Sequence, residues 1–278
     1  MEQASPSPGS IPVTYIGAMT PESKPSLRVA SWNIHKAVGT DLRRDTDRVL
    51  AGIAALQADI VALQEADKRL GARPSALPRD RIAELTGLVP LAIGRNAVSL
   101  GWHGNALLAR PGIHLTGVEH LDLPGHEPRG AVIADLDTPN PLRVVCVHLG
   151  LLRSARRQQL DAIKAALNRH PTRPTVILGD FNEWSTRSGT EPLNGPFRVH
   201  VPGRSYPAGR PVAALDRIAL SAGMHLLDAG TLSTPISRRA SDHLPVWADV
   251  RAELPRHDTS WPEARISGAG LSSGPAQP

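Results

Sequence analysis

Cysteine is almost absent from this chain of 278 residues, which contains only Cys146. A single cysteine excludes an internal disulfide, and a chain without disulfides fits the reducing cytosol. Cys146 lies among β-favouring residues, where we expect a small buried hydrophobic side chain rather than a reactive thiol. The sequence therefore predicts a cytoplasmic protein.

Aromatic residues and lysines are also scarce. Aromatic residues make up 3% of the chain, which leaves few platforms on which an extended single-stranded nucleic acid can stack. The chain has four lysines, so nearly all of the positive charge behind its net charge of +5 comes from arginine. This charge is spread along the chain and forms no dense basic block of the kind found in nucleic-acid-binding tails. It permits an anionic substrate without identifying one.

Long apolar runs are missing as well. No stretch of about 18 apolar residues occurs, so the sequence predicts no membrane-spanning segment. The first 20 residues are rich in proline and serine, and they lack the basic region and apolar core of a secretory signal. No amphipathic basic helix indicates docking on a membrane surface.

The rest of the composition is that of an ordinary globular protein, with 41% hydrophobic and 21% charged residues. We expect one domain over residues 26–254. Disordered tails are expected at residues 1–25 and 255–278, where proline, glycine and serine accumulate. Within the domain, many β-rich stretches alternate with fewer helical ones, which predicts an α/β or α+β fold with a mixed sheet.

The apolar periodicity places the individual elements. Strands are expected at residues 27–33, 59–65, 88–89, 106–108, 131–134, 143–148, 175–178, 214–220 and 241–247. Helices are expected at residues 43–57 with Asp41 as the N-cap, at 79–86 with Gly87 as the end, and at 154–169 before Pro171.

The stretch from Thr175 to Asn182 combines a buried strand with polar residues at its end. Apolar β-formers are followed by Gly179, where we expect the backbone to turn, and then by Asp180 and Asn182 at alternate positions. In extended backbone these two side chains leave the edge of the sheet on the same side. An ordinary Asx turn explains the same residues without any function. The stretch alone does not decide between the two interpretations.

A repeated spacing relates this stretch to three other strand ends. Asn33 and Glu65 are separated by 32 residues, as are His148 and Asp180, and each pair encloses a strand–helix–strand pattern. A right-handed unit of this kind brings both strand ends to one edge of its sheet. We therefore expect the four side chains at a common rim. Coincidence is the alternative explanation, because the two halves share no sequence identity.

Polar side chains follow most of the predicted strands: Asn33, Glu65, His148, Asp180, Asn182, Asp216, Asp242 and His243. Carboxylates and amides without cysteine suit a hard cation such as Mg²⁺, with Mn²⁺ as the alternative. The histidines lack the spacing of zinc ligands. Metal-assisted attack of water on a phosphoester is the reaction that such a set of groups supports.

Six short motifs occur in the order found in the endonuclease/exonuclease/phosphatase superfamily, the DNase I-like group. They are Ser31–Ile34, Leu63–Glu65, Val147–Leu149, Gly179–Asn182, Leu215–Ile218 and Ser241–Val246. Each motif is weak alone, but six in the expected order are a strong signal, and they are distributed over nearly the whole length of residues 27–250, so the chain resembles this superfamily. The segments Asn33–Lys36, Asp180–Trp184 and Ser205–Pro207 are similar to those of a bacterial subgroup encoded near cardiolipin synthases.

The resemblance implies a four-layered α/β sandwich, with two mixed β-sheets face to face between helices. It implies that Glu65, helped by Asn33 and Asp242, binds the metal. It also implies roles for five catalytic residues. Asp180 would align or activate the attacking water, and Asn182 would hold a phosphate oxygen. His243 would contact the phosphate as a charge stabiliser or general base, Asp216 would orient His243, and His148 would bind the phosphate or assist the leaving oxygen.

Three further residues are candidates for substrate contacts. Arg129 can reach a phosphate, Lys36 lies just after Asn33, and Trp184 can stack on a base. The alternatives are a surface arginine at the start of a strand, a solvated loop lysine, and a tryptophan that packs over the edge of the core.

These observations predict a Mg²⁺-dependent phosphoric ester hydrolase that acts as a phosphodiesterase or nuclease. The alternative is a phosphatase or phospholipase-like hydrolase of a lipid or small-molecule phosphoester. A non-catalytic binding module is disfavoured, because the set of polar residues is intact. The expected partner is a phosphoester substrate (nucleic acid, lipid or small molecule); we infer no protein partner and expect a monomer. The loops that select the substrate cannot be interpreted from one sequence.

Overall fold

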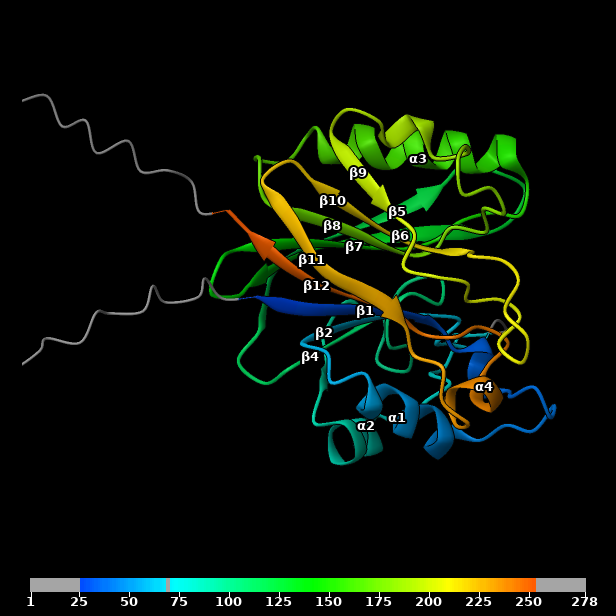
Figure 1. Cartoon of the computed structure of the whole chain (residues 1–278). Helices are drawn as coiled ribbons and strands as arrows, with labels where there is room; N and C mark the ends of the chain where they lie inside the picture. Colours follow the sequence, from blue (N-terminus) through cyan, green and yellow to red (C-terminus); the bar gives the residue numbers. More distant parts are fainter. Residues whose placement is uncertain (1–25, 69–70, 254–278) are drawn as a thin grey trace, which may run out of the picture.

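The computed structural model describes residues 26–68 and 71–253, so the two tails predicted to be disordered lie outside the described residues. Two six-stranded β-sheets pack face to face, and helices cover the outer surface of each sheet (Figure 1). The predicted four-layered α/β sandwich with two mixed sheets is confirmed. No helix in the described ranges is both long enough and apolar enough to cross a membrane.

The first sheet is built around a parallel pair of strands. Its strands lie in the order β11 (Met224–Thr231), β12 (Val246–Ala252), β1 (Leu27–Asn33), β2 (Ile60–Gln64), β4 (Ala106–Ala109) and β3 (Val89–Pro90). The short turn η1 (His35–Ala37) and helix α1 (Thr46–Ala55) connect the parallel strands β1 and β2. Helices α1, α2 (Arg79–Thr86) and α4 (Ser237–Ala240) lie on the outer side of this sheet (Figure 1).

The second sheet contains the other parallel pair. Its strands lie in the order β5 (His114–Leu123), β6 (Arg129–Asp137), β7 (Leu142–His148), β8 (Thr175–Asp180), β10 (Asp216–Ser221) and β9 (Phe197–His200). Helix α3 (Arg153–Leu167) connects the parallel strands β7 and β8 and covers the outer side of the sheet, and the short helix η2 (Glu191–Leu193) packs against it.

Each central strand contributes to two hydrophobic cores, because neighbouring residues of a strand face opposite sides of the sheet. In β2, Ile60 and Ala62 pack between the two sheets, whereas Val61 and Leu63 pack beneath the helices. This double burial explains the continuous apolar runs in the sequence. Cys146 of β7 lies in the core between the sheets, where burial raises the pKa of its thiol to about 12. The thiol is therefore inert, as expected.

Three local predictions are wrong. Helix α1 begins after Asp45, whose side chain accepts a hydrogen bond from the backbone of Arg48 at 2.9 Å, and Asp41 instead forms an ion pair with the Arg48 guanidinium. The strand expected from residue 241 begins only at Val246. Gly179 does not turn the chain but lies within β8; a Cβ there would be 1.9 Å from the carbonyl oxygen of Val147 on β7.

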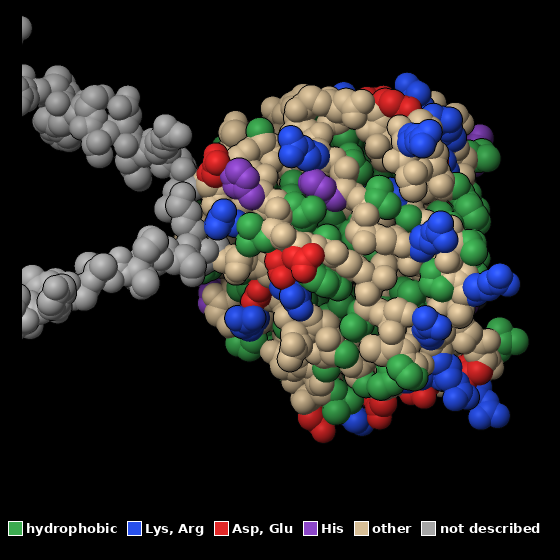
Figure 2. Space-filling view, in the orientation of Figure 1, with side chains coloured by type: hydrophobic (Ala, Val, Ile, Leu, Met, Phe, Trp, Pro, Cys, Tyr) green, Lys and Arg blue, Asp and Glu red, His purple; other side chains and the backbone are tan. Residues whose placement is uncertain are grey.

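The strands β5, β9 and β11 were not predicted. All three lie at the ends of their sheets, and their residues are mostly exposed or half-buried. Edge strands bury one face at most, so their apolar signal in the sequence is weak. In the face shown in Figure 2, Lys and Arg side chains are scattered among hydrophobic and uncharged ones, in agreement with the absence of a basic block.

Both parallel pairs end at the same edge of the sandwich. Asn33 at the end of β1 is in register with Gln64 of β2, and His148 at the end of β7 is in register with Asp180 of β8. Strand β12 runs antiparallel to β1, so the loop before Val246 reaches the same edge. The equal spacings in the sequence therefore reflect two strand–helix–strand units whose ends meet at one rim.

Trp32 of β1 connects the helix-covered core to this rim. Its side chain is fully buried, and its indole Nε1 donates a hydrogen bond to the carbonyl oxygen of His243 at 2.8 Å. Helix α1 has a glycine, Gly52, where it crosses the indole. A Cβ at Gly52 would lie 2.6 Å from the six-membered ring, so only glycine lets the helix approach this closely.

We predict that Gly52→Ala destabilises the protein by about 1–3 kcal/mol in urea unfolding, because the added methyl overpacks the space beside the Trp32 ring. Helix propensity alone would stabilise the variant by about 1 kcal/mol. In a Trp32→Phe background the smaller ring should reduce the cost of the same substitution. An equal cost in both backgrounds would contradict the assignment of the clash to Trp32.

Candidate active site

Asp180, the last residue of β8, is the polar centre of the rim. Its Oδ2 atom accepts a hydrogen bond from the side-chain amide of Asn33 at 3.1 Å. The same oxygen lies 3.4 Å from Nε2 of His148 and 3.7 Å from Nε2 of His243. One carboxylate oxygen therefore gathers groups from both sheets. Asp180 is 1% exposed, and a buried environment strengthens such interactions.

The other oxygen of Asp180 has a structural role. Oδ1 accepts a hydrogen bond from the backbone N–H of Asn182 at 2.9 Å, which forms an Asx turn. Asn182 has a φ of 50°, so the expected extended backbone is wrong at this residue. Its side-chain amide donates to the carbonyl oxygen of Leu149 at 2.8 Å. An amide group has two N–H donors, so Asn182 can also donate to a substrate oxygen.

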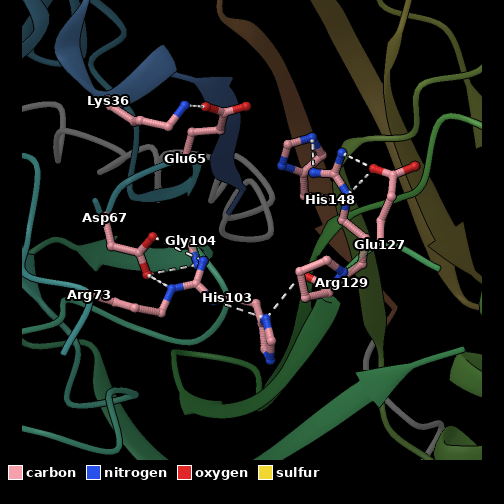
Figure 3. A pocket seen from close by; sticks show the side chains of 10 residues that line it. Lys36, Glu65, Asp67, Arg73, His103, Gly104, Glu127, Arg129 and His148 are labelled. Carbon is pink, nitrogen blue, oxygen red and sulfur yellow. Dashed lines mark hydrogen bonds and ion pairs between the residues drawn. The ribbon is translucent and has the colours of Figure 1, made fainter. Parts of the chain in front are cut away.

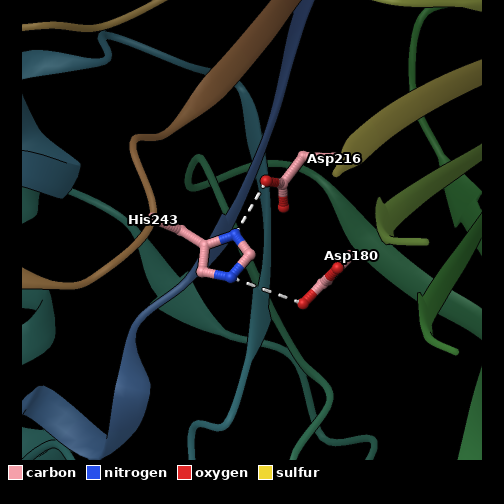
Figure 4. A group of neighbouring side chains, drawn as sticks. All are labelled: Asp180, Asp216 and His243. Carbon is pink, nitrogen blue, oxygen red and sulfur yellow. Dashed lines mark hydrogen bonds and ion pairs between the residues drawn. The ribbon is translucent and has the colours of Figure 1, made fainter. Parts of the chain in front are cut away.

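His243 is fixed through its ring and its backbone. Nδ1 lies 2.9 Å from Oδ2 of Asp216, a fully buried carboxylate at the start of β10 (Figure 4). Burial lowers the pKa of His243, but the negative charges of Asp216 and Asp180 outweigh burial and raise the pKa to about 10. The paired imidazole therefore carries a proton at neutral pH, and its Nε2 can donate to an anionic group.

Glu65, which follows β2, forms an ion pair with the ammonium group of Lys36 (Figure 3). Glu65, Asn33 and Asp242 line one cavity of about 300 Å³, together with Asp180 and His243. Their carboxylate and amide oxygens are the donors that Mg²⁺ takes in proteins. The ion pair with Lys36 shows that the Glu65 carboxylate already binds a positively charged group. This set of oxygen donors therefore fits a hard divalent cation.

A second group of ligand-type atoms lies close by. One atom each of Asp180, Asp216 and His243 lie within 4.8 Å of one another (Figure 4). Nδ1 of His243 is already engaged by Asp216 at hydrogen-bond distance, and the imidazole is protonated. A protonated histidine cannot ligate a metal. This group is therefore a candidate for hydrogen bonding to a substrate, and the oxygen donors around Glu65 are the candidate ligands of a cation.

The three candidate substrate contacts also lie at the rim. Arg129 at the start of β6 binds Glu127 at 2.6 and 3.0 Å and lies 2.8 Å from Nε2 of His148. It is therefore not a solvated surface arginine, and the pairing of Lys36 with Glu65 likewise excludes a solvated loop lysine. Trp184 is 63% exposed and lines the cavity rather than packing over the core.

Tyr206 and Glu183 near the site were not identified from the sequence, and Arg156 had only a weak signal as part of an anion path, with solvent exposure as the alternative. The ring of Tyr206 lies 5.0 Å from the ring of His243 and lines the same cavity. Arg156 of α3 forms a buried ion pair with Glu183 at 2.8 Å, which joins the loops after β7 and β8. The one sequence signal was the position of Arg156 at a helix start, where a positive charge is unfavourable to the helix dipole.

Three of the candidate site residues have left-handed backbone conformations. Lys36 has a φ of 57°, Glu65 a φ of 53° and Asn182 a φ of 50°. For residues other than glycine this conformation costs on the order of 1 kcal/mol, and such residues cluster at functional sites. The carboxylate of Glu65 faces Lys36 and the cavity, so a residue with a strained backbone carries one of the polar groups of the site.

The comparisons with known proteins agree with this geometry. The model of the Endonuclease/Exonuclease/phosphatase family matches residues 30–243. The uncharacterized protein YbhP of Escherichia coli strain K12 is 31% identical over 255 residues, which cover 81% of this chain and 96% of YbhP. The narrower resemblance to a subgroup encoded near cardiolipin synthases stays a prediction, because none of these comparisons concerns gene neighbourhood.

Two solved structures illustrate the shared fold. The mannosyl-6-phosphatase of Bacteroides thetaiotaomicron has a TM-score of 0.63 at 19% identity, with 81% of this chain and 99% of that chain covered. The D. rerio TDP2 complexed with a single-strand DNA product has a TM-score of 0.61 at 16% identity, with 82% and 99% covered. With the family match over most of its length and the polar rim described above, the chain belongs to the endonuclease/exonuclease/phosphatase family of phosphoester hydrolases.

Proposed function

We propose that this protein is a divalent-metal-dependent phosphodiesterase of the nuclease type, which cleaves its substrate by metal-assisted attack of water. The observation that carries the proposal is the single cavity in which the oxygen donors of Glu65, Asn33 and Asp242 meet Asp180 and His243. Such a cavity combines cation ligands, a carboxylate that can orient water and a cationic donor for phosphate. These are the groups that phosphoester hydrolysis requires.

Glu65 is the principal ligand for Mg²⁺ or Mn²⁺ in this proposal, and Asn33 and Asp242 assist it. The bound cation supplies Lewis-acid polarisation of a phosphoryl oxygen. Asp180 accepts a hydrogen bond from the attacking water and aligns it, since its Oδ2 already accepts from neighbouring donors in the cavity. In this role Asp180 also receives the proton that the water loses.

His243 donates from Nε2 to a phosphate oxygen and stabilises the negative charge that develops there. Asp216 holds the imidazole in the orientation and protonation state that this role needs, which favours charge stabilisation over the general-base role. Asn182 donates to a second phosphate oxygen. His148, whose Nε2 lies 2.8 Å from Arg129 and 3.4 Å from Oδ2 of Asp180, assists the leaving oxygen.

A second candidate function is hydrolysis of a lipid or small-molecule phosphoester. Leu151 and Trp184, which are 64% and 63% exposed, line the cavity beside Tyr206 and form an apolar wall. An apolar or planar substituent of a phosphoester can contact this wall, whether it is a nucleobase or another group. The names of the two structural neighbours, a mannosyl-6-phosphatase and a protein bound to single-strand DNA, leave both substrate classes open.

The proposal is tested with bis(p-nitrophenyl) phosphate, p-nitrophenyl phosphate, plasmid DNA, RNA and phospholipids, each with Mg²⁺, with Mn²⁺ and with EDTA. We predict metal-dependent turnover that is faster on the diester than on the monoester. Glu65→Gln should lower kcat/KM by about 10²–10³-fold, because it removes the principal metal ligand.

The exposed carboxylate of Glu84 on α2 provides the matched control, and Glu84→Gln should retain full activity. Equal activity of Glu65→Gln and Glu84→Gln, or hydrolysis that persists in EDTA, would contradict a metal site at Glu65.

We predict that His243→Ala reduces kcat by about 10²–10⁴-fold, because it removes the donor to the phosphate. Asp216→Asn should reduce kcat by only about 10-fold, because the imidazole stays in place with a weaker partner. The exposed His225 on β11 supplies the control variant His225→Ala. A larger loss from Asp216→Asn than from His243→Ala, at equal folding stability, would exclude a purely orienting role for Asp216.

We predict that Trp184→Ala raises the KM for bis(p-nitrophenyl) phosphate about 5- to 10-fold, because stacking on an aromatic ring contributes roughly 1–3 kcal/mol. Hydrolysis of dimethyl phosphate, which has no ring to stack, should keep its KM. Leu227→Ala, at an exposed residue of β11, is the control. A similar increase in KM for both substrates would indicate instead that Trp184 stabilises the structure of its loop.

A further inference from the structure

A second cavity adjoins the catalytic one. This second cavity, shown in Figure 3, has a volume of about 150 Å³. Glu65, Arg129 and His148 line both cavities. The other wall of the second cavity is formed by Arg73 and His103. Neither residue has a role in the function proposed above. The volume corresponds to that of about five water molecules at about 30 Å³ each, which is enough for one phosphoryl group.

The lining of this second cavity consists of matched opposite charges. Lys36 pairs with Glu65, Arg129 binds Glu127 at 2.6 Å, and Arg73 binds Asp67 at 3.2 Å. Arg73 also lies 3.0 Å from Nδ1 of His103. Asp67 is 3% exposed and accepts a hydrogen bond from the backbone of Gly104, so Arg73 is held by a rigid buried carboxylate. Apart from the histidines, three positive and three negative groups balance in this wall.

Backbone strain is concentrated in the same wall. Nine residues other than glycine have a positive φ in the described chain, and four of them line this cavity. The four come from separate segments: Lys36 (57°), Glu65 (53°), Arg73 (54°) and His103 (48°). Left-handed conformations persist only where the surrounding structure enforces them, and they cluster at ligand sites. Ion pairing alone does not require such backbone conformations.

The charge balance changes when Glu65 exchanges its partner. In the proposed function Glu65 is the ligand of a divalent cation, and Lys36 then loses its partner to that cation. The lining gains two positive charges, and the released ammonium group of Lys36 lies at the same wall as the guanidinium of Arg73. Guanidinium and ammonium groups together bind phosphate oxygens through charge-assisted hydrogen bonds.

We propose that this second cavity binds a second phosphate group of the substrate, one that is not cleaved. Arg73 is the specificity residue, because its guanidinium is fixed by Asp67 and faces the cavity. Lys36 couples this site to the metal, because it becomes available only when it leaves Glu65. The inference rests on the proposed function and names its substrate class: a phosphoester that carries a second phosphate close to the scissile one.

The test measures binding by calorimetry with two pairs of ligands that differ by one phosphate. The first pair is 1,3-propanediol bisphosphate and propyl phosphate; the second is thymidine 3′,5′-bisphosphate and thymidine 5′-monophosphate. With Mg²⁺, the bisphosphate of a pair should bind about tenfold more tightly, as expected for one charge-assisted contact. Without Mg²⁺ this advantage should shrink, because Lys36 stays on Glu65. If the gain in affinity from the second phosphate is larger in the thymidine pair, the source of that phosphate is a nucleic acid. If the gain in affinity is equal in both pairs, the source is not a nucleotide.

Arg73→Gln should reduce the advantage of the second phosphate to less than twofold. Because this change leaves the buried Asp67 without its partner, the double variant Asp67→Asn/Arg73→Gln is measured as well and should behave in the same way. Arg110→Gln is the matched control, since Arg110 forms an ion pair with Asp59 away from the site and should keep the tenfold advantage.

The proposal is overturned if the wild-type protein binds both members of each pair equally. It is also overturned if the advantage survives in both Arg73 variants. Bis(p-nitrophenyl) phosphate carries no second phosphate, so its hydrolysis reports on the proposed function independently. Turnover of this diester with equal binding within each pair would reject the second phosphate site alone, whereas absence of any metal-dependent turnover would reject the proposed function.

Discussion

The contact between Oδ2 of Asp180 and the side chains around it is the interaction on which the rim depends. Asn33 reaches this oxygen from the first sheet, His148 from the second, and His243 from the loop before β12. Each sheet alone carries only part of the constellation. The packing of the two sheets across their common core therefore also brings the polar groups within hydrogen-bonding and ion-pair distances of one another.

The rim has two unlike sides. One side is apolar and exposed, with Leu151 and Trp184, whereas the other is an ionic wall in which Lys36 and Arg73 have paired partners. Each cation on the ionic side is balanced by a carboxylate, as partly buried charges require. A phosphoester bound between these sides would place an apolar substituent against Leu151 and Trp184 and a charged substituent against the ionic wall.

The sequence allowed the general site to be predicted because strand ends are easily recognised. A parallel strand–helix–strand unit places its polar end residues at one edge, which sufficed for Asn33 and His148. Of the ionic wall, Arg73 and His103 were not predicted, because Arg73 approaches His103, and His103 the carbonyl oxygen of Pro128, through contacts distant in sequence. Asp180 illustrates both cases: the Asx turn and a place in a polar site looked like alternatives, yet one oxygen forms the Asx turn and the other accepts a hydrogen bond from Asn33 at the rim.

The hydrogen bond from Trp32 to the backbone of His243 has a consequence for the dynamics of the molecule. Catalytic residues often lie on loops that open with little free energy, independently of the rest of the fold. Here the carbonyl oxygen of His243 accepts a hydrogen bond from a fully buried indole in the core beneath α1, so opening of the loop that carries His243 leaves a buried N–H without its partner. An unpaired buried donor costs about 1–3 kcal/mol, so this loop is held to the core more firmly than the exposed side chains of Leu151 and Trp184.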